Sequence, residues 1–220
     1  MATAGLITFS AYAFDRGIEN EEDSRRSAGL KKALIALAIL ACTASFILFP
    51  SFGLLLPFLI TYLYSKGIAG YRLKGGAGRK NAVVGLTWAV LLAVLIGRFD
   101  LPALLVYSFF FAKSFVNTAI YDVRDREADL RAGIRTLPGV LPLPWFRALL
   151  LAVTGAFHAA VIAAASAGIL CAGDIGVVSA AYTGAYVLVY STGFSAWRNG
   201  IVDGEWMVYA IYSILRAFFL

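Results

Sequence analysis

Long apolar stretches recur along almost the whole chain, and short polar segments separate them. An α-helix crosses the roughly 30 Å hydrocarbon core of a bilayer in about 20 residues, so such stretches predict membrane-spanning helices. Hydropathy places them at about residues 2–14, 33–49, 51–65, 81–97, 101–121, 146–170, 174–194 and 205–220. No segment sustains the alternation of a membrane β-strand. We therefore expect a single domain, residues 1–220, folded as an all-α, multi-pass transmembrane helical bundle of about eight spans.

The composition agrees with this fold class and excludes a soluble one. Hydrophobic residues make up 60% of the 220 residues and charged residues 15%, too few charges for the polar surface of a soluble domain. The net charge of +6 comes mainly from basic residues in the loops, which the positive-inside rule explains without a nucleic-acid partner. We predict an integral membrane protein whose longer, basic loops face the cytoplasm.

Acidic residues share these loops with the basic ones. Asp122, Asp125 and Asp129 follow the fifth apolar stretch at spacings of three and four, so a helix leaving the membrane carries them on one face. Like charges so placed repel by roughly 0.2–0.5 kcal/mol per pair in an isolated helix. Carboxylates suit Mg²⁺, so these three residues are a candidate metal site. We call them the second acidic ladder, because another set precedes them in the chain. The alternative is a solvated helix end whose carboxylates pair with neighbouring arginines.

A similar set follows the first apolar stretch. Asp15, Glu19 and Asp23 lie at i, i+4 and i+8, again on one face of a helix leaving the membrane. We call these residues the first acidic ladder and predict that it lies on the cytoplasmic side with the second ladder. Two ladders on one membrane face can hold two metal ions and a diphosphate between them.

The sequence around both ladders has a family resemblance. Residues 122–138, DVRDREADLRAGIRTLP, resemble the second aspartate-rich motif of the UbiA prenyltransferase superfamily and the Gly-x-x-Thr-Leu-Pro segment after it, here Gly133 to Pro138. Residues 12–23, YAFDRGIENEED, are similar to the family's first motif but depart from it. Asp15 stands where the family usually has Asn, Arg16 where it often has Asp, and Glu19 replaces the middle Asp. Oxygen ligands are kept at all three positions of the first ladder.

The resemblance covers nearly the whole chain and implies a nine-helix bundle. In the family the motifs follow helices two and six, whereas the ladders here follow the first and fifth apolar stretches. The chain therefore resembles helices two to nine, lacking the family's first helix. We expect either that an upstream extension encodes the missing helix or that the chain is a reduced member of the family.

The resemblance also implies an activity: Mg²⁺-dependent transfer of a prenyl group from a prenyl diphosphate to a lipophilic acceptor, aromatic or hydroxylic, within the lipid membrane. The two ladders would bind Mg²⁺, and Asp122, Asp125 and Asp129 would be the catalytic residues. Basic residues of the neighbouring loops are the candidates for binding the diphosphate: Arg72, Lys74, Lys80 and Arg135. A flexible glycine-rich loop without this role is the alternative for the first three.

Two other function classes stay open. One is a non-catalytic or truncated UbiA-like protein, which the altered first motif favours. The other is an ion-coupled transporter, although transporters place their sites near the membrane midplane and these carboxylates are predicted at helix ends. Lys113, Asn117 and His158 lie within apolar stretches, where polar side chains are costly, and either line a site or bond to a neighbouring helix.

Overall fold

The computed structural model describes residues 2–18, 27–68, 73, 76–131, 133–171 and 173–219. The elements in these ranges are α1 (Ala2–Gly17), α2 (Ala28–Leu48), the 3₁₀ helix η2 (Phe52–Leu55), α3 (Leu56–Ser65), α4 (Arg79–Ile96), α5 (Leu101–Arg131), α6 (Leu137–Val140), α7 (Leu143–Ser166), α8 (Gly173–Tyr190), α9 (Arg198–Val202) and α10 (Gly204–Phe219). All of them are helices, so the predicted all-α class is confirmed.

Four of the helices, α2, α4, α5 and α7, are long and apolar enough to cross a membrane. Each of the other predicted spans also coincides with helix, but α1 and α10 have only 16 residues each, about 24 Å of helix. Large apolar side chains such as Leu40, Ile47 and Phe52 are exposed on the outer surface. Together these features indicate a membrane protein, while the full count of about eight spans stays a prediction.

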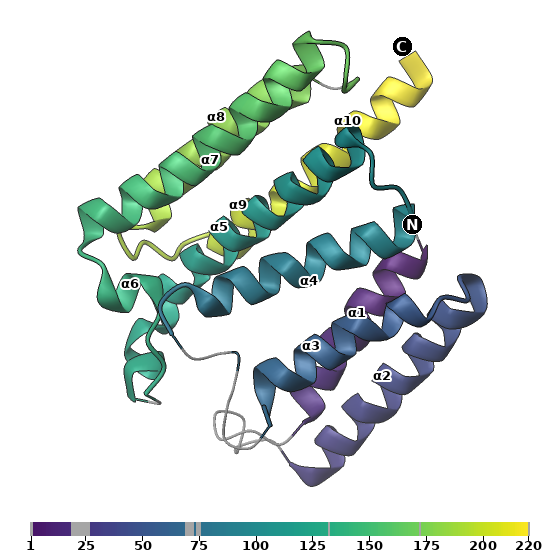
Figure 1. The fold of residues 1–220 in the computed structure, drawn as a ribbon. Helices are drawn as coiled ribbons and strands as arrows, with labels where there is room; N and C mark the ends of the chain where they lie inside the picture. Colours follow the sequence, from purple (N-terminus) through teal and green to yellow (C-terminus); the bar gives the residue numbers. More distant parts are fainter. Residues whose placement is uncertain are drawn as a thin grey trace.

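Successive long helices run in opposite directions and pack side by side (Figure 1). Helix α1 packs on α2 and α3, α4 packs between α3 and α5, and α5 packs on α7, which pairs with α8. Figure 1 shows the C-terminal ends of α1 and α5 and the N-terminal end of α4 at one end of the bundle, with both chain termini at the other. We call the end that holds the last turns of α1 and α5 and the first turn of α4 the charged end. The side of the membrane that it faces stays a prediction.

Helix α5 is the central element, and it continues beyond the predicted span of residues 101–121, as expected from the second ladder. It starts after Asp100, whose Oδ1 accepts a hydrogen bond from the Ala103 N–H at 3.1 Å, and it continues through the second ladder to Arg131. Its buried side chains, among them Val116 and Ile120, pack against α7 and α8. The carboxylates of the second ladder are therefore fixed on a rigid helix, as the spacing predicted.

Close packing of α4 on α5 brings polar residues of the two helices together. A Cβ atom at Gly85 would lie 2.7 Å from the backbone oxygen of Phe111, so only glycine permits this approach. Nearer the charged end, the Asn81 side chain donates to the Thr118 hydroxyl at 3.2 Å. This register places the first turn of α4 beside the second ladder.

Candidate functional site at the charged end

Two carboxylates of the second ladder, those of Asp122 and Asp129, contact the same lysine. The ammonium of Lys80 lies 2.7 Å from Asp122 Oδ1 and 3.2 Å from Asp129 Oδ2. Asn81 adds a hydrogen bond of 2.8 Å from its Nδ2 to Asp122 Oδ2. Asp122 is 2% exposed and Asp129 7% exposed, so these charges interact with little screening by water. We call Lys80, Asn81, Asp122 and Asp129 the Lys80 cluster.

The third carboxylate of the second ladder, Asp125, faces away from Lys80 and pairs with Arg124. Its Oδ1 lies 2.6 Å from Nε of Arg124, although Lys80 and Arg198 are within electrostatic range. Helix geometry explains why Asp125 points away from Lys80. At 3.6 residues per turn, Asp129 is rotated about 20° around the helix axis from Asp122, whereas Asp125 is rotated about 60° from Asp122. Among the described residues no three acidic, histidine or cysteine side chains gather closely enough to hold a metal ion. Within the second ladder, only Asp122 and Asp129 approach a common point, which the Lys80 ammonium occupies. The second ladder by itself therefore offers two carboxylate ligands to a metal ion.

The first ladder is described only at Asp15. This carboxylate ends α1 and accepts a hydrogen bond from the Ser65 hydroxyl at the end of α3. Glu19 and Asp23, and the basic residues Arg72 and Lys74, lie outside the described residues. Tyr12, one turn before Asp15, is within electrostatic range of Tyr121 and Arg124 on α5. The ends of α1 and α5 thus lie at the same end of the bundle (Figure 1), and the two-ladder site stays a prediction.

The Gly-x-x-Thr-Leu-Pro segment turns the chain after α5. Gly133 has φ of 72°, a left-handed conformation that suits glycine, and the Ile134 N–H donates to the Asp129 carbonyl at 2.8 Å, closing the helix end. Pro138 lies in the first turn of α6, where its missing N–H is harmless. Arg135 is exposed between these points. The motif therefore has a clear structural role, and the part of Arg135 in diphosphate binding stays a prediction.

Arg198 and Asp203 extend the charged end in a way that the sequence patterns did not single out. The Tyr121 hydroxyl donates to Asp203 Oδ2 at 2.8 Å, and the Arg198 guanidinium lies 5.3 Å from the centre of the Tyr121 ring. Arg198 is buried, yet its Nε has no hydrogen-bond partner among the described residues. A buried donor of this kind is suited to an anionic ligand.

The Lys80 cluster fits Mg²⁺ in the chemistry of its donors. Asp122 and Asp129 provide carboxylate oxygens, and the buried Oδ1 of Asn81 lacks a hydrogen-bond partner in the described part of the chain. Hard oxygen donors, with phosphate oxygens of a substrate completing the coordination, are what Mg²⁺ prefers. In the structure the Lys80 ammonium provides the positive charge that these carboxylates require.

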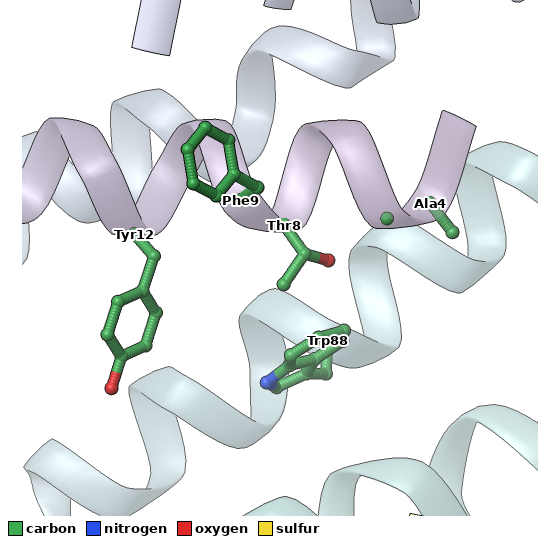
Figure 2. Close-up of a pocket in the computed structure, with 6 residues that line it drawn as sticks. Ala4, Thr8, Phe9, Tyr12 and Trp88 are labelled. Atoms are coloured by element: carbon green, nitrogen blue, oxygen red, sulfur yellow. The ribbon is translucent and has the colours of Figure 1, made fainter. Parts of the chain in front are cut away.

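An apolar groove of about 510 Å³ lies between α1 and α4 (Figure 2). Residues of α1 and one of α4 line it: Ala4, Gly5, Thr8, Phe9, Tyr12 and Trp88. Figure 2 shows the Tyr12 and Trp88 rings between the two helices. Tyr12 is the lining residue nearest the charged end along α1, so the groove leads from that end toward the opposite one.

A second polar cluster lies inside the bundle. Lys113 of α5 forms an ion pair with Glu205 of α10, and the two residues are 2% and 1% exposed. The Lys113 ammonium also donates to Thr183, and the single histidine, His158, contacts Ser179. Lys113 and His158 thus bond to neighbouring helices, one of the two alternatives that the sequence left open. Glu205 was missed because an acidic residue opening an apolar stretch is typical of an interfacial position.

Comparison of the chain with protein-family models, with curated proteins and with solved structures gives no match. The function is therefore argued from the geometry of these sites.

The Lys80 cluster yields a prediction that needs no substrate. Lys80→Met is expected to lower the thermal unfolding midpoint in detergent, because Asp122 and Asp129 then face each other without a buried cation. Adding Mg²⁺ is expected to restore part of the loss, because a ligand that binds only the folded state stabilises it. Lys32→Met, a change at an exposed lysine of α2, is the control. A Lys80→Met protein with an unchanged midpoint, or with no larger response to Mg²⁺ than wild type, would contradict this prediction.

Proposed function

We propose that the protein transfers a prenyl group from a prenyl diphosphate to a lipophilic aromatic or hydroxylic acceptor within the membrane, in a Mg²⁺-dependent reaction, as its resemblance to the UbiA superfamily implies. The observation that carries the proposal is the Lys80 cluster. Two buried carboxylates on one face of α5 lie beside the Asn81 amide of α4 at the end of an apolar bundle, and the oxygen of this amide has no hydrogen-bond partner among the described residues. Mg²⁺ bound by these oxygens would neutralise the charge of the leaving diphosphate.

The residues of the chain would divide the work of binding the donor. Lys80 and the buried Arg198 are cations beside the ladder, and both suit diphosphate oxygens. The groove along α1 is apolar and suits the prenyl tail. From Tyr12 to Ala4 it follows about 12 Å of helix. Diphosphate at the charged end and hydrocarbon along α1 would place the reacting carbon near Tyr12 and Tyr121.

The aromatic rings at this point suit the reaction. When the bond to the diphosphate breaks, an allylic cation forms, and the face of a tyrosine ring attracts positive charge. The Arg198 guanidinium over the Tyr121 ring shows that this ring already accepts a cation. The apolar lining of the groove would limit the access of water, which competes with the acceptor for the cation.

The test is product formation by the full-length chain in lipid vesicles. We expect diphosphate release and a prenylated product when a prenyl diphosphate, Mg²⁺ and a phenolic or long-chain hydroxylic acceptor are supplied. Chelation of Mg²⁺ should stop both. A folded protein that releases no diphosphate with any donor and acceptor of these classes would contradict prenyl transfer and favour a non-catalytic UbiA-like protein.

An ion-coupled transporter is the second candidate, and the interior Lys113–Glu205 pair is the observation that favours it. Ionisable groups inside a membrane bundle often bind a coupling ion or a proton. The Lys80 cluster has no evident purpose in such a protein. Solute uptake by the same vesicles under an imposed pH gradient, without diphosphate release, would support this class over the enzyme.

A further inference from the structure

A chain of hydrogen bonds connects two ionisable groups inside the bundle, His158 and Glu205, through the hydroxyl of Ser179. Nε2 of His158 lies 2.8 Å from the Ser179 hydroxyl, and that hydroxyl lies 2.9 Å from Oε1 of Glu205. Glu205 Oε1 also accepts from Lys113, Thr183 and Tyr209, whereas its buried Oε2 has no partner among the described residues. His158, Ser179 and Glu205 come from α7, α8 and α10, so the chain joins three helices.

The tautomer of His158 follows from its neighbours. Nδ1 lies 2.6 Å from the carbonyl oxygen of Thr154, which only accepts hydrogen bonds, so Nδ1 carries a hydrogen. In a neutral imidazole Nε2 is then an acceptor and requires a hydrogen from Ser179. Ser179 has one hydroxyl hydrogen, and its 2.9 Å contact with Oε1 of Glu205 requires a hydrogen as well. The Tyr209 hydroxyl also contacts Ser179, but it donates its own hydrogen to Oε1 of Glu205 and so supplies none to this chain. With neutral His158 and ionised Glu205, the chain therefore lacks one hydrogen.

One added proton completes the chain in either of two arrangements. In the first, His158 is an imidazolium that donates from Nε2 to Ser179, and Ser179 donates to Glu205. In the second, Glu205 is a carboxylic acid that donates to Ser179, and Ser179 donates to neutral His158. The arrangements interconvert when the Glu205 O–H bond breaks, its proton passes to Ser179, and the Ser179 proton forms an N–H bond at Nε2. Each step conserves atoms and charge.

We propose that Glu205, Ser179 and His158 form a proton relay inside the bundle that binds and exchanges one proton. The relay goes beyond prenyl transfer and stands on its own hydrogen bonds. Other titratable groups in the described part of the chain face the relay: Lys113 of α5, Tyr182 and Tyr186 of α8, and Tyr209 of α10. Lys113 balances the carboxylate when Glu205 is ionised. The Phe109 ring packs on His158 at nearly a right angle, with the two ring centres 5.1 Å apart.

The experiment uses the fact that His158 is the only histidine. The ¹⁵N chemical shifts of the imidazole, measured for the full chain in lipid nanodiscs from about pH 4 to about pH 10, report its tautomer and protonation state. We expect the Nδ1–H tautomer in the neutral form. Ser179→Ala should change the pH at which His158 titrates, because the relay is cut while both ends remain. Ser166→Ala, at an exposed serine of α7, should leave the titration unchanged.

A second variant removes the far end of the relay. Lys113→Met combined with Glu205→Gln removes the carboxyl group together with its partner, so no buried ammonium is left unpaired. In this paired variant His158 should titrate at a different pH from wild type. Three results would overturn the relay: an Nε2–H tautomer, no titration of His158 in wild type, or the same titration in wild type, Ser179→Ala and the paired variant. None of these results depends on whether the protein transfers prenyl groups.

Discussion

Asp122→Asn and Asp129→Asn are each expected to lower the rate of prenyl transfer by about 100-fold or more. Removing one group that stabilises developing charge costs this much in other enzymes. Asparagine keeps the size of the side chain but removes the negative charge that would hold Mg²⁺ and that Lys80 now balances. A smaller loss is expected for Asp125→Ala, because this carboxylate lies within electrostatic range of Lys80 but pairs with Arg124 outside the Lys80 cluster.

The control for these variants lies at the opposite end of the bundle. Asp100 is an exposed carboxylate that accepts a hydrogen bond of 2.8 Å from Arg98, and Asp100→Asn is expected to keep wild-type turnover. Turnover and the thermal unfolding midpoint should be measured on the same preparations at saturating Mg²⁺. If Asp122→Asn or Asp129→Asn folds and keeps near wild-type turnover, the Lys80 cluster is not the metal site.

Lys113→Met alone is expected to destabilise the protein by about 3 to 5 kcal/mol, the usual cost of leaving one partner of a buried ion pair unpaired. Glu205→Gln should cost a similar amount by leaving the Lys113 ammonium unpaired. The double variant should recover most of the loss, because neither charge is then buried alone. Unfolding of all three proteins in mixed micelles measures the coupling.

The exposed Arg98–Asp100 pair is the matched control for this cycle. Its side chains are 67% and 41% exposed, so removing either partner is expected to change the free energy of unfolding little, because water screens the pair. Additive losses at Lys113 and Glu205, with no recovery in the double variant, would show that the two charges do not depend on each other.

The sequence predicted the helices well because apolar length and helix periodicity act locally. Each predicted span coincides with helix, and the three- and four-residue spacing of the second ladder correctly predicted a helix leaving the bundle. Hydropathy alone ended the fifth span at residue 121, and the ladder spacing was the pattern that predicted the continuation of α5. In the extension to Arg131, Asp122 accepts a hydrogen bond from Asn81 of α4 and Asp129 accepts one from Lys80.

The site was predicted less completely because it depends on contacts between distant segments. Spacing alone placed three carboxylates on one face, but the contact with Lys80 selects Asp122 and Asp129, about two turns apart, and leaves Asp125 with Arg124. Lys80 was predicted to bind diphosphate, and the structure places it between these carboxylates. The Lys113–Glu205 pair joins residues far apart in the chain, and no local pattern connects them.

Mg²⁺-dependent binding of a non-hydrolysable prenyl diphosphate analogue tests the proposed site most directly. Wild type, Asp122→Asn, Asp23→Asn and the Asp100→Asn control should be compared in lipid nanodiscs with and without Mg²⁺. We predict that wild type and the control bind the analogue only with Mg²⁺ and that Asp122→Asn and Asp23→Asn lose this binding, because each ladder supplies part of the site. Binding of the analogue without Mg²⁺, or equal binding by all four proteins, would contradict a two-ladder diphosphate site.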